Sequence, residues 1–174
     1  MIEQLNSDHI HLDIGQEQVT IRPITPEDKA IEAAFVHNLS LETKHERFFE
    51  GIKDLSPYML KKLCEIDYVT TMAYVATVQS DGAEKEIGVV RYAAGANESE
   101  RELAITVADA YSFQDVALPL MDALLKHAKA NNVKRLFSIE LSTNYRFHEL
   151  ATRLGMHAAS DPDNGGQMIY SMNL

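Results

Sequence analysis

The spacing of apolar side chains changes twice along this 174-residue chain, and this change limits the folds that the chain can adopt. Residues 9–14 and 19–24 alternate apolar and polar side chains around Gly15, which predicts two half-buried strands joined by a turn. Between positions 25 and 66 apolar residues recur every three or four positions, as in helices. From position 72 the period of two returns, and strand and helix patterns then alternate. We therefore predict a mixed α/β fold with a central, largely antiparallel sheet flanked by helices on both faces.

Local signals give the boundaries of these elements. Thr25-Pro26-Glu27-Asp28 combines an N-cap residue, a proline at the first helical position and acidic residues, and predicts a helix that reaches about Leu39. Ser40 and Ser56-Pro57 predict two further helix starts. We expect the last strand of the chain to close the sheet. The remaining predicted elements are strands at 72–78, 87–94, 103–107, 135–141 and 167–174, and helices within 115–130 and at 144–154.

Charge and composition exclude several classes of function. Lys and Arg number 16 against 26 Asp and Glu, so the formal net charge is −10, and such a surface repels nucleic-acid phosphates and anionic lipid. The N-terminus has no basic start or apolar run of a signal peptide, and no stretch is apolar enough to span a membrane, which predicts a cytoplasmic protein. Cys64 follows the apolar face of its helix and is interpreted as a core residue. Because His9 and His11 lack a third ligand, no metal site is predicted.

Three stretches of the sequence carry a family resemblance. They are Ile21 to Asp28, Leu39 through Arg47-Phe48-Phe49 to Ala73, and Asn144 through Gly155-Met156 to Asp163. Together they resemble the GNAT superfamily of acyl-CoA-dependent N-acetyltransferases, and the second is similar to the GNAT domain of bacterial protein-lysine acetyltransferases. The resemblance covers residues 19–174 and leaves 1–18 as an N-terminal extension with an extra strand. It implies acetyl-CoA as the co-substrate, an amine or a protein lysine as the acceptor and, by analogy, a homodimer.

The same resemblance places the cofactor's pyrophosphate at a loop before the central helix. Relatives carry the pattern Q/R-x-x-G-x-G/A there, and its backbone N–H groups bind the phosphates. This segment has no glycine here, and no Lys or Arg occurs between Arg101 and Lys126. We expect Asp115 to cap the helix and occupy the N–H groups that a pyrophosphate needs, with Pro119 in the first turn. The residues that correspond to the cofactor loop are Ser112, Phe113, Gln114, Asp115, Val116 and Ala117.

Candidate catalytic residues lie on the strand before this loop and on the helix at 144–154. The resemblance implies that Glu102 is the base that takes a proton from the incoming ammonium, and a solvated acid at a strand end is the alternative. It also implies that Ile105 and Val107 contact the cofactor, with N–H groups near Val107 binding the acyl oxygen. Asn144 is expected to contact the cofactor's arm, to cap its helix, or both. Ala151 stands where many relatives carry a tyrosine that protonates the departing thiolate.

Two functions therefore remain open for this sequence. The first is an acyl-CoA-dependent N-acetyltransferase that uses Glu102 as its base. The second is a catalytically degenerate GNAT-like domain that senses a ligand or binds a partner protein, because its pyrophosphate loop departs from the family pattern. A third arrangement, in which CoA binds in a shifted pose with another phosphate anchor, fits the same residues.

Overall fold

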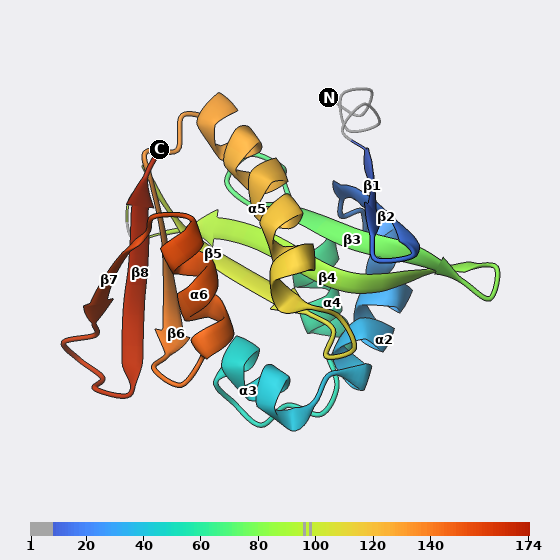
Figure 1. The fold of residues 1–174 in the computed structure, drawn as a ribbon, viewed down its shortest axis with the longest axis horizontal. Coiled ribbons are helices and arrows are strands. Elements are labelled where there is room, and N and C mark those ends of the chain that lie inside the picture. The colour runs from blue at the N-terminus through green and yellow to red at the C-terminus, as the bar shows by residue number, and fades with distance from the viewer. Residues whose placement is uncertain (1–8, 96, 98) are drawn as a thin grey trace.

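The computed structural model describes residues 9–95, 97 and 99–174, which form a single sheet with helices on both faces (Figure 1). Within the described residues the sheet has eight strands in the order β1-β2-β3-β4-β5-β6-β8-β7. The predicted fold class is therefore confirmed. The strands are β1 (Ile10–Ile14), β2 (Glu17–Pro23), β3 (Met72–Ser80), β4 (Ala83–Ala94), β5 (Glu100–Val107), β6 (Arg135–Leu141), β7 (His157–Ser160) and β8 (Gln167–Asn173).

Neighbouring strands run antiparallel except for one parallel pair, β5 and β6. These two strands pair over three positions, from Glu100 with Arg135 to Glu102 with Phe137. Beyond that point β5 continues beside β4 alone, whereas β6 continues beside β8. Figure 1 shows the two strands running apart at a wide angle. The sheet therefore splits between β5 and β6 toward the carboxyl-terminal ends of both strands.

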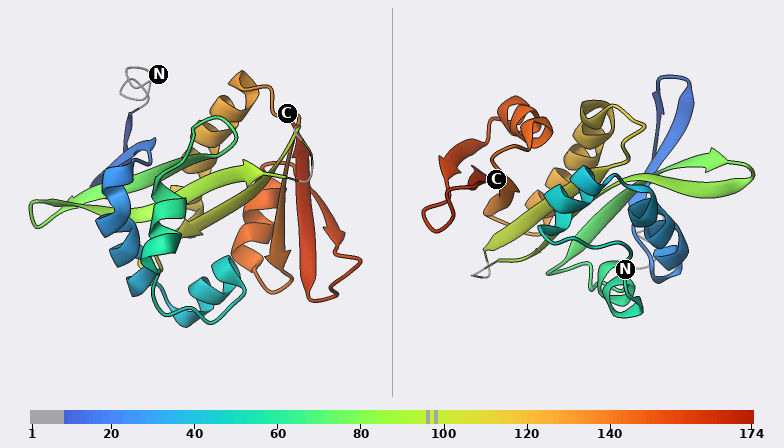
Figure 2. Two further views of the ribbon diagram at one scale, coloured as in Figure 1. Left: turned by 180° about the vertical axis from the view of Figure 1, so that it is seen from behind. Right: turned by 90° about the horizontal axis from the view of Figure 1, so that it is seen from below.

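Helices cover the two faces of this sheet. Helices α5 and α6 lie on one face, and α2 and α4 lie on the other, as the front and back views show (Figures 1 and 2). Helix α3 packs against β5, near the split in the sheet. The helical segments are the 3-10 turn η1 (Pro26–Asp28) and helices α2 (Lys29–Asn38), α3 (Leu41–Phe48), α4 (Pro57–Cys64), α5 (Phe113–Ala130) and α6 (Tyr145–Arg153).

Two apolar clusters join the helices to the sheet. Leu103 of β5 and Leu120 of α5 belong to the larger cluster, on the face that α5 and α6 cover. The second cluster packs Phe35 of α2 against Val89 of β4 and includes Cys64, which has no exposed surface. Fully burying a side chain such as Leu or Phe stabilises the fold by about 1.5–3 kcal/mol. The interpretation of Cys64 as a core residue is confirmed, and burial raises the pKa of its thiol to about 12.

The predicted helix starts are confirmed where a nearby side chain caps the helix. The Ser40 and Ser56 side chains each accept a hydrogen bond from the backbone N–H three residues later, at 3.1 and 3.2 Å. At the first helix the Asp28 carboxylate accepts from the Thr25 backbone N–H at 2.7 Å. Regular α-helix begins only at Lys29, after the 3-10 turn that Pro26 opens. Side chains that satisfy free N–H groups therefore fix these boundaries.

Strand β7 is absent from the sequence prediction and changes the place of β8. Residues His157–Ser160 pair antiparallel with β8, so β8 lies inside the sheet and β7 forms its edge. The expectation that the last strand closes the sheet is wrong for this reason. All four side chains of β7 are exposed, so the segment has no alternation of apolar and polar residues that could reveal a strand.

At the opposite edge of the sheet, β1 pairs with β2 from Ile10–Ile21 to Ile14–Glu17. It is the extra strand expected before residue 19. Residues 1–8 lie outside the described part of the chain, and the boundary between an N-terminal extension and an acyltransferase domain stays a prediction. None of the helices in the described residues is long and apolar enough to cross a membrane.

Candidate active site

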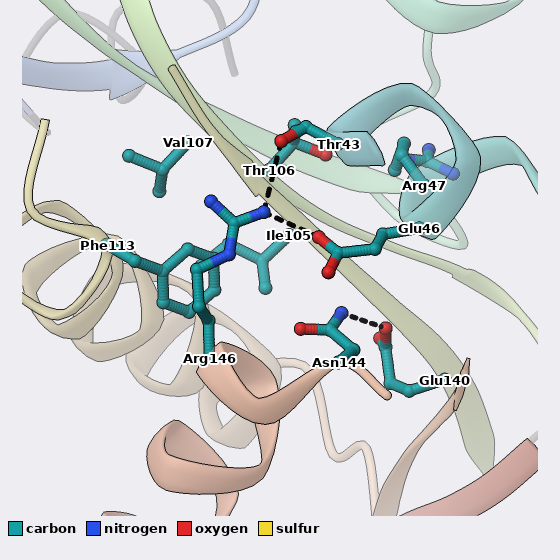
Figure 3. Close-up of a pocket in the computed structure, with 10 residues that line it drawn as sticks. All are labelled: Thr43, Glu46, Arg47, Ile105, Thr106, Val107, Phe113, Glu140, Asn144 and Arg146. Carbon is teal, nitrogen blue, oxygen red and sulfur yellow. Dashed lines mark hydrogen bonds and ion pairs between the residues drawn. The ribbon is translucent and has the colours of Figure 1, made fainter. Parts of the chain in front are cut away.

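A narrow cleft lies where β5 and β6 separate, and Figure 3 shows the side chains around it. Its volume is about 10 Å³, close to the least space that a water molecule needs. Segments that are far apart in the sequence meet here, because α3 and the start of α6 approach the split from opposite sides. The lining residues are Thr43, Glu46, Arg47, Ile105, Thr106, Val107, Phe113, Glu140, Asn144 and Arg146.

Arg146 crosses this cleft from α6 toward α3 (Figure 3). Its Nη2 donates to Glu46 Oε2 at 2.5 Å and to Thr43 Oγ1 at 3.1 Å. Its guanidinium carbon lies 5.4 Å from the centre of the Phe113 ring, at the start of α5. Gln114 Nε2 donates to the Arg146 backbone carbonyl at 2.9 Å and also joins the two helices. Arg146 therefore connects the first turns of α5 and α6 with α3.

Asp109, in the loop between β5 and α5, fixes α3 from the other side. Its carboxylate accepts hydrogen bonds from the Ser40 N–H at 2.8 Å, the Ser40 hydroxyl at 2.9 Å and the Thr43 hydroxyl at 2.6 Å. Partial burial opposes ionisation of this group, but the hydrogen bonds from Thr43 and Ser40 outweigh it and lower the pKa of Asp109. An ionised Asp109 thus holds the start of α3 beside the cleft.

Glu140 is a buried acid in this site that the sequence analysis missed. Its carboxylate accepts from the Ser138 hydroxyl at 2.5 Å and from Asn144 Nδ2 at 2.9 Å. Burial raises the pKa of Glu140 to about 7, although both hydrogen bonds and the nearby charge of Arg47 act in the opposite direction. Leu136, Ser138 and Glu140 alternate on the buried face of β6, and an acid in such a series is the signal that could have identified it.

Arg47 on α3 lies among charges from several elements. Burial and the charge of Arg91 lower the pKa of Arg47 to about 10, whereas Glu32, Glu140 and Glu102 act to raise it. Its guanidinium carbon lies 4.9 Å from the centre of the Phe48 ring. Arg47 remains a cation at neutral pH and lies close enough to the candidate base Glu102 and to Glu140 for its charge to act on both.

Asn144 takes the position that the capping interpretation predicts. Its Oδ1 accepts from the Phe147 backbone N–H at 3.1 Å, which caps α6, while its Nδ2 donates to Glu140. The side chain is buried and lines the cleft. The cap is therefore confirmed, and contact with a cofactor stays a prediction.

The start of α5 differs from the sequence prediction. The helix begins at Phe113 after an extended Ser112, whose carbonyl accepts from the Val116 N–H at 3.3 Å. Asp115 is the third helical residue and is exposed, so the prediction that it caps the helix is wrong. Pro119 lies in the second turn rather than the first. The earlier start lets Val116 and Leu120 face the core, and Gln114 secures the first turn through Arg146.

The Ser112 side chain makes no capping hydrogen bond, so no N-cap side chain covers the first N–H groups of α5. Thr106 supplies a second unsatisfied group, because its buried hydroxyl has no hydrogen-bond partner in the described residues. Buried polar groups in folded proteins are almost always paired. Both features fit a ligand that accepts hydrogen bonds in this cleft.

The structure gathers some of the predicted site residues and separates others. Ile105, Val107, Phe113 and Asn144 line the cleft, whereas Ser112, Gln114 and Asp115 are not among its lining residues. Ala117 is fully buried in the core. Among the described residues, no three His, Cys, Asp or Glu side chains are grouped so that they could hold a metal ion.

Glu102 lies at the last position where β5 and β6 pair, directly before the split. Its side chain is exposed and does not line the closed cleft. The strand alternation places it on the face of Thr106, opposite the buried Leu103. Ala151, at the place of the family's tyrosine, is buried in the core.

The mixed sheet, its split between β5 and β6 and the open N-terminus of α5 agree with the fold that the sequence resemblance implies, and sequence comparison identifies the family. The sequence model of the acetyltransferase (GNAT) domain matches residues 18–157. The chain is also 38% identical over 163 residues to Acetyltransferase PA5475 of Pseudomonas aeruginosa, which covers 94% of this chain and 87% of that protein. The chain belongs to the GNAT acetyltransferase family.

Solved structures share the same fold. The GNAT domain of S. lividans PAT superposes with a TM-score of 0.85 at 22% identity and covers 97% of this chain and 98% of that one. RimL, a ribosomal L7/L12 alpha-N-protein acetyltransferase in complex with coenzyme A, gives a TM-score of 0.70 at 11% identity, covering 95% and 98%. These identities support the likeness in fold alone.

Proposed function

We propose that this chain transfers the acetyl group of acetyl-CoA to an amine, with a lysine side chain of a protein as the favoured acceptor. The observation that carries the proposal is the cleft between β5 and β6 beside the open first turn of α5, with Glu102 at the point of separation. Membership of the family supports acetyl transfer. The net charge of −10 favours a cationic acceptor such as lysine.

The residues present fit acetyl-CoA, which would supply the activated thioester. The first-turn N–H groups of α5 would bind phosphate, as helix N-termini do. Asn144 and the β5 backbone at Ile105 and Val107 would bind the amide arm. The unpartnered Thr106 hydroxyl lies in the same cleft and can donate a hydrogen bond there.

The proposed chemistry needs a neutral amine. Glu102 accepts a proton from the incoming ammonium, and the neutral amine nitrogen attacks the thioester carbonyl carbon to give a tetrahedral intermediate. The carbon–sulfur bond then breaks, and the released thiolate takes up the second proton of the amine nitrogen. The N–H near Val107 stabilises the charge that develops on the acyl oxygen. Because Ala151 replaces the tyrosine acid, the thiolate leaves unassisted, which its ordinary pKa of about 8.5 permits.

Replacement of the base tests this function. In Glu102→Gln, the rate of acetyl transfer to a lysine-containing peptide is expected to fall at least about 100-fold. The rate is measured from the thiol that the reaction releases. Glu100→Gln, two residues earlier on the same strand, is the control and is expected to keep native turnover. Equal turnover in the native and Glu102→Gln chains would remove Glu102 from the mechanism.

A second candidate function is a domain that binds a ligand or a partner protein without catalysis. The closed cleft favours it, because its volume of about 10 Å³ is too small for the arm of acyl-CoA. Calorimetric titration of the native chain with acetyl-CoA separates the two functions. Micromolar binding supports the acetyltransferase, and the absence of binding at millimolar acetyl-CoA supports the binding domain. A homodimer stays a prediction by analogy with the family.

A further inference from the structure

The loop before α5 lacks the positive charge that would favour binding of a pyrophosphate. Within 112–117 the charged residue is Asp115, which is exposed, and the nearest basic residues in sequence are Arg101 and Lys126. The family's glycines are also missing from this loop. A pyrophosphate placed at the first turn of α5 would therefore meet a carboxylate and no cation from this segment.

A cation reaches the same turn from another helix. The Arg146 guanidinium lies over the Phe113 ring at 5.4 Å, and the Arg146 carbonyl accepts from Gln114 Nε2 at 2.9 Å. The cation of α6 is thus fixed beside the two residues that begin α5. Figure 3 shows the guanidinium between Phe113 and Glu46, directed into the cleft below Val107.

The hydrogen bonds of Arg146 use only part of its guanidinium. Both its bond to Glu46 and its bond to Thr43 come from Nη2, while Nη1 and Nε donate to no other side chain of the described residues. The side chain is 36% exposed, whereas that of Glu46 is 13% exposed. Glu46 and Thr43 therefore hold the group in place and leave a pair of donors in the planar arrangement that suits phosphate oxygens.

We propose that Arg146 is the phosphate anchor of this chain and binds the pyrophosphate of acyl-CoA in place of the glycine-containing loop of its relatives. The assignment rests on the proposed function. It is a role in binding and positioning, because Arg146 contacts Phe113 and Gln114 in the first turn of α5, where the proposed function places the phosphate. Thr106, buried and unpartnered in the same cleft, is a separate indication that a ligand completes the hydrogen bonds here.

The test compares two probes, acetyl-CoA and S-acetylpantetheine, which shares the thioester arm but has no phosphate. Titration calorimetry measures the Kd of each probe for the native chain, Arg146→Gln, Arg146→Lys and Arg153→Gln. Arg153 is the matched control because it is an arginine on the same helix, paired with Glu149 away from the cleft. Circular dichroism of each variant checks that the fold is intact.

We expect Arg146→Gln to weaken acetyl-CoA binding about 10- to 100-fold and to leave S-acetylpantetheine binding unchanged. Arg146→Lys keeps the charge and recovers part of the loss, and Arg153→Gln binds both probes like the native chain. Equal acetyl-CoA affinity in Arg146→Gln and Arg153→Gln overturns the assignment. So does an equal loss for both probes, which would show that Arg146 shapes the cleft and does not contact phosphate. If the native chain binds neither probe, the proposed function itself fails and the anchor falls with it.

Discussion

Two helices begin beside the cleft, and their first turns are built differently. Helix α6 starts at Asn144, whose side chain caps the helix and is itself fixed by the buried Glu140. The N-cap residue of α5 is Ser112, whose side chain makes no capping hydrogen bond. Helix N-termini attract anions through free N–H groups and the helix dipole. The comparison shows that the chain fills one of these termini with its own side chain and leaves the other open, at the place where family members bind phosphate.

The largest expected effect concerns the acid that supports the α6 cap. The folded chain keeps a proton on Glu140 up to about pH 7, whereas the unfolded chain loses it near the ordinary value of 4.5. The folded state therefore binds more protons between these values, and its stability falls by about 3 kcal/mol as pH rises through them. In Glu140→Gln we expect this decrease to be absent. Urea unfolding at pH 5 and pH 8 measures the free energy of unfolding at both values.

Glu149→Gln is the control for this experiment, because Glu149 is an exposed acid on α6, the helix whose cap Glu140 supports. It is expected to keep the native pH dependence. The same slope in Glu140→Gln as in the native chain would contradict the assignment of the proton to Glu140.

Removal of the two N-cap side chains tests the comparison directly. Asn144→Ala loses the α6 cap and takes a donor from Glu140, so we expect the free energy of unfolding to fall by about 2 kcal/mol. Ser112→Ala removes a side chain that caps nothing, and its effect is expected to stay below about 0.5 kcal/mol. Urea unfolding of both variants measures the contrast, and equal losses would show that α5 has a cap after all.

A modest gain in stability is expected when α5 receives a cap of its own. A carboxylate in Ser112→Asp can accept from the first-turn N–H groups and stabilises the chain by about 0.5–1 kcal/mol. It also competes with phosphate, so acetyl-CoA binding is expected to weaken about tenfold by titration calorimetry. Unchanged acetyl-CoA affinity with increased stability would place the phosphate away from this turn.

Local signals explain how much of the fold could be predicted from the sequence. Three helix caps depend on short-range contacts, because each side chain accepts a hydrogen bond from the N–H three positions later. They are Ser40, Ser56 and Asn144, and a local sequence pattern is enough to predict them. Asp115 has the same chemistry but lies inside its helix, because packing of Val116 against the core moves the start earlier. A tertiary contact there outweighs a local preference.

The candidate site was harder to predict, because its contacts join distant segments. Glu46 and Arg146 are 100 positions apart, and the approach of α3 to α6 gives no periodic signal in either helix. The family resemblance singled out Glu102 as the candidate base, its position at the split comes from the structure, and its role as base stays a prediction. Glu140 could have been predicted from the alternation along β6, because it is an acid in a series of buried positions.

The three-position pairing of β5 with β6 also has a mechanical consequence. It is the join between two parts of the sheet, one formed by β1 to β5 and the other by β6, β8 and β7. A molecule bound in the cleft would contact both parts and so oppose their separation. At a ligand concentration of about 100 times Kd, such binding adds about 2.7 kcal/mol to the free energy of unfolding. If acetyl-CoA binds there as proposed, the resistance of this protein to heat would increase with the concentration of acetyl-CoA.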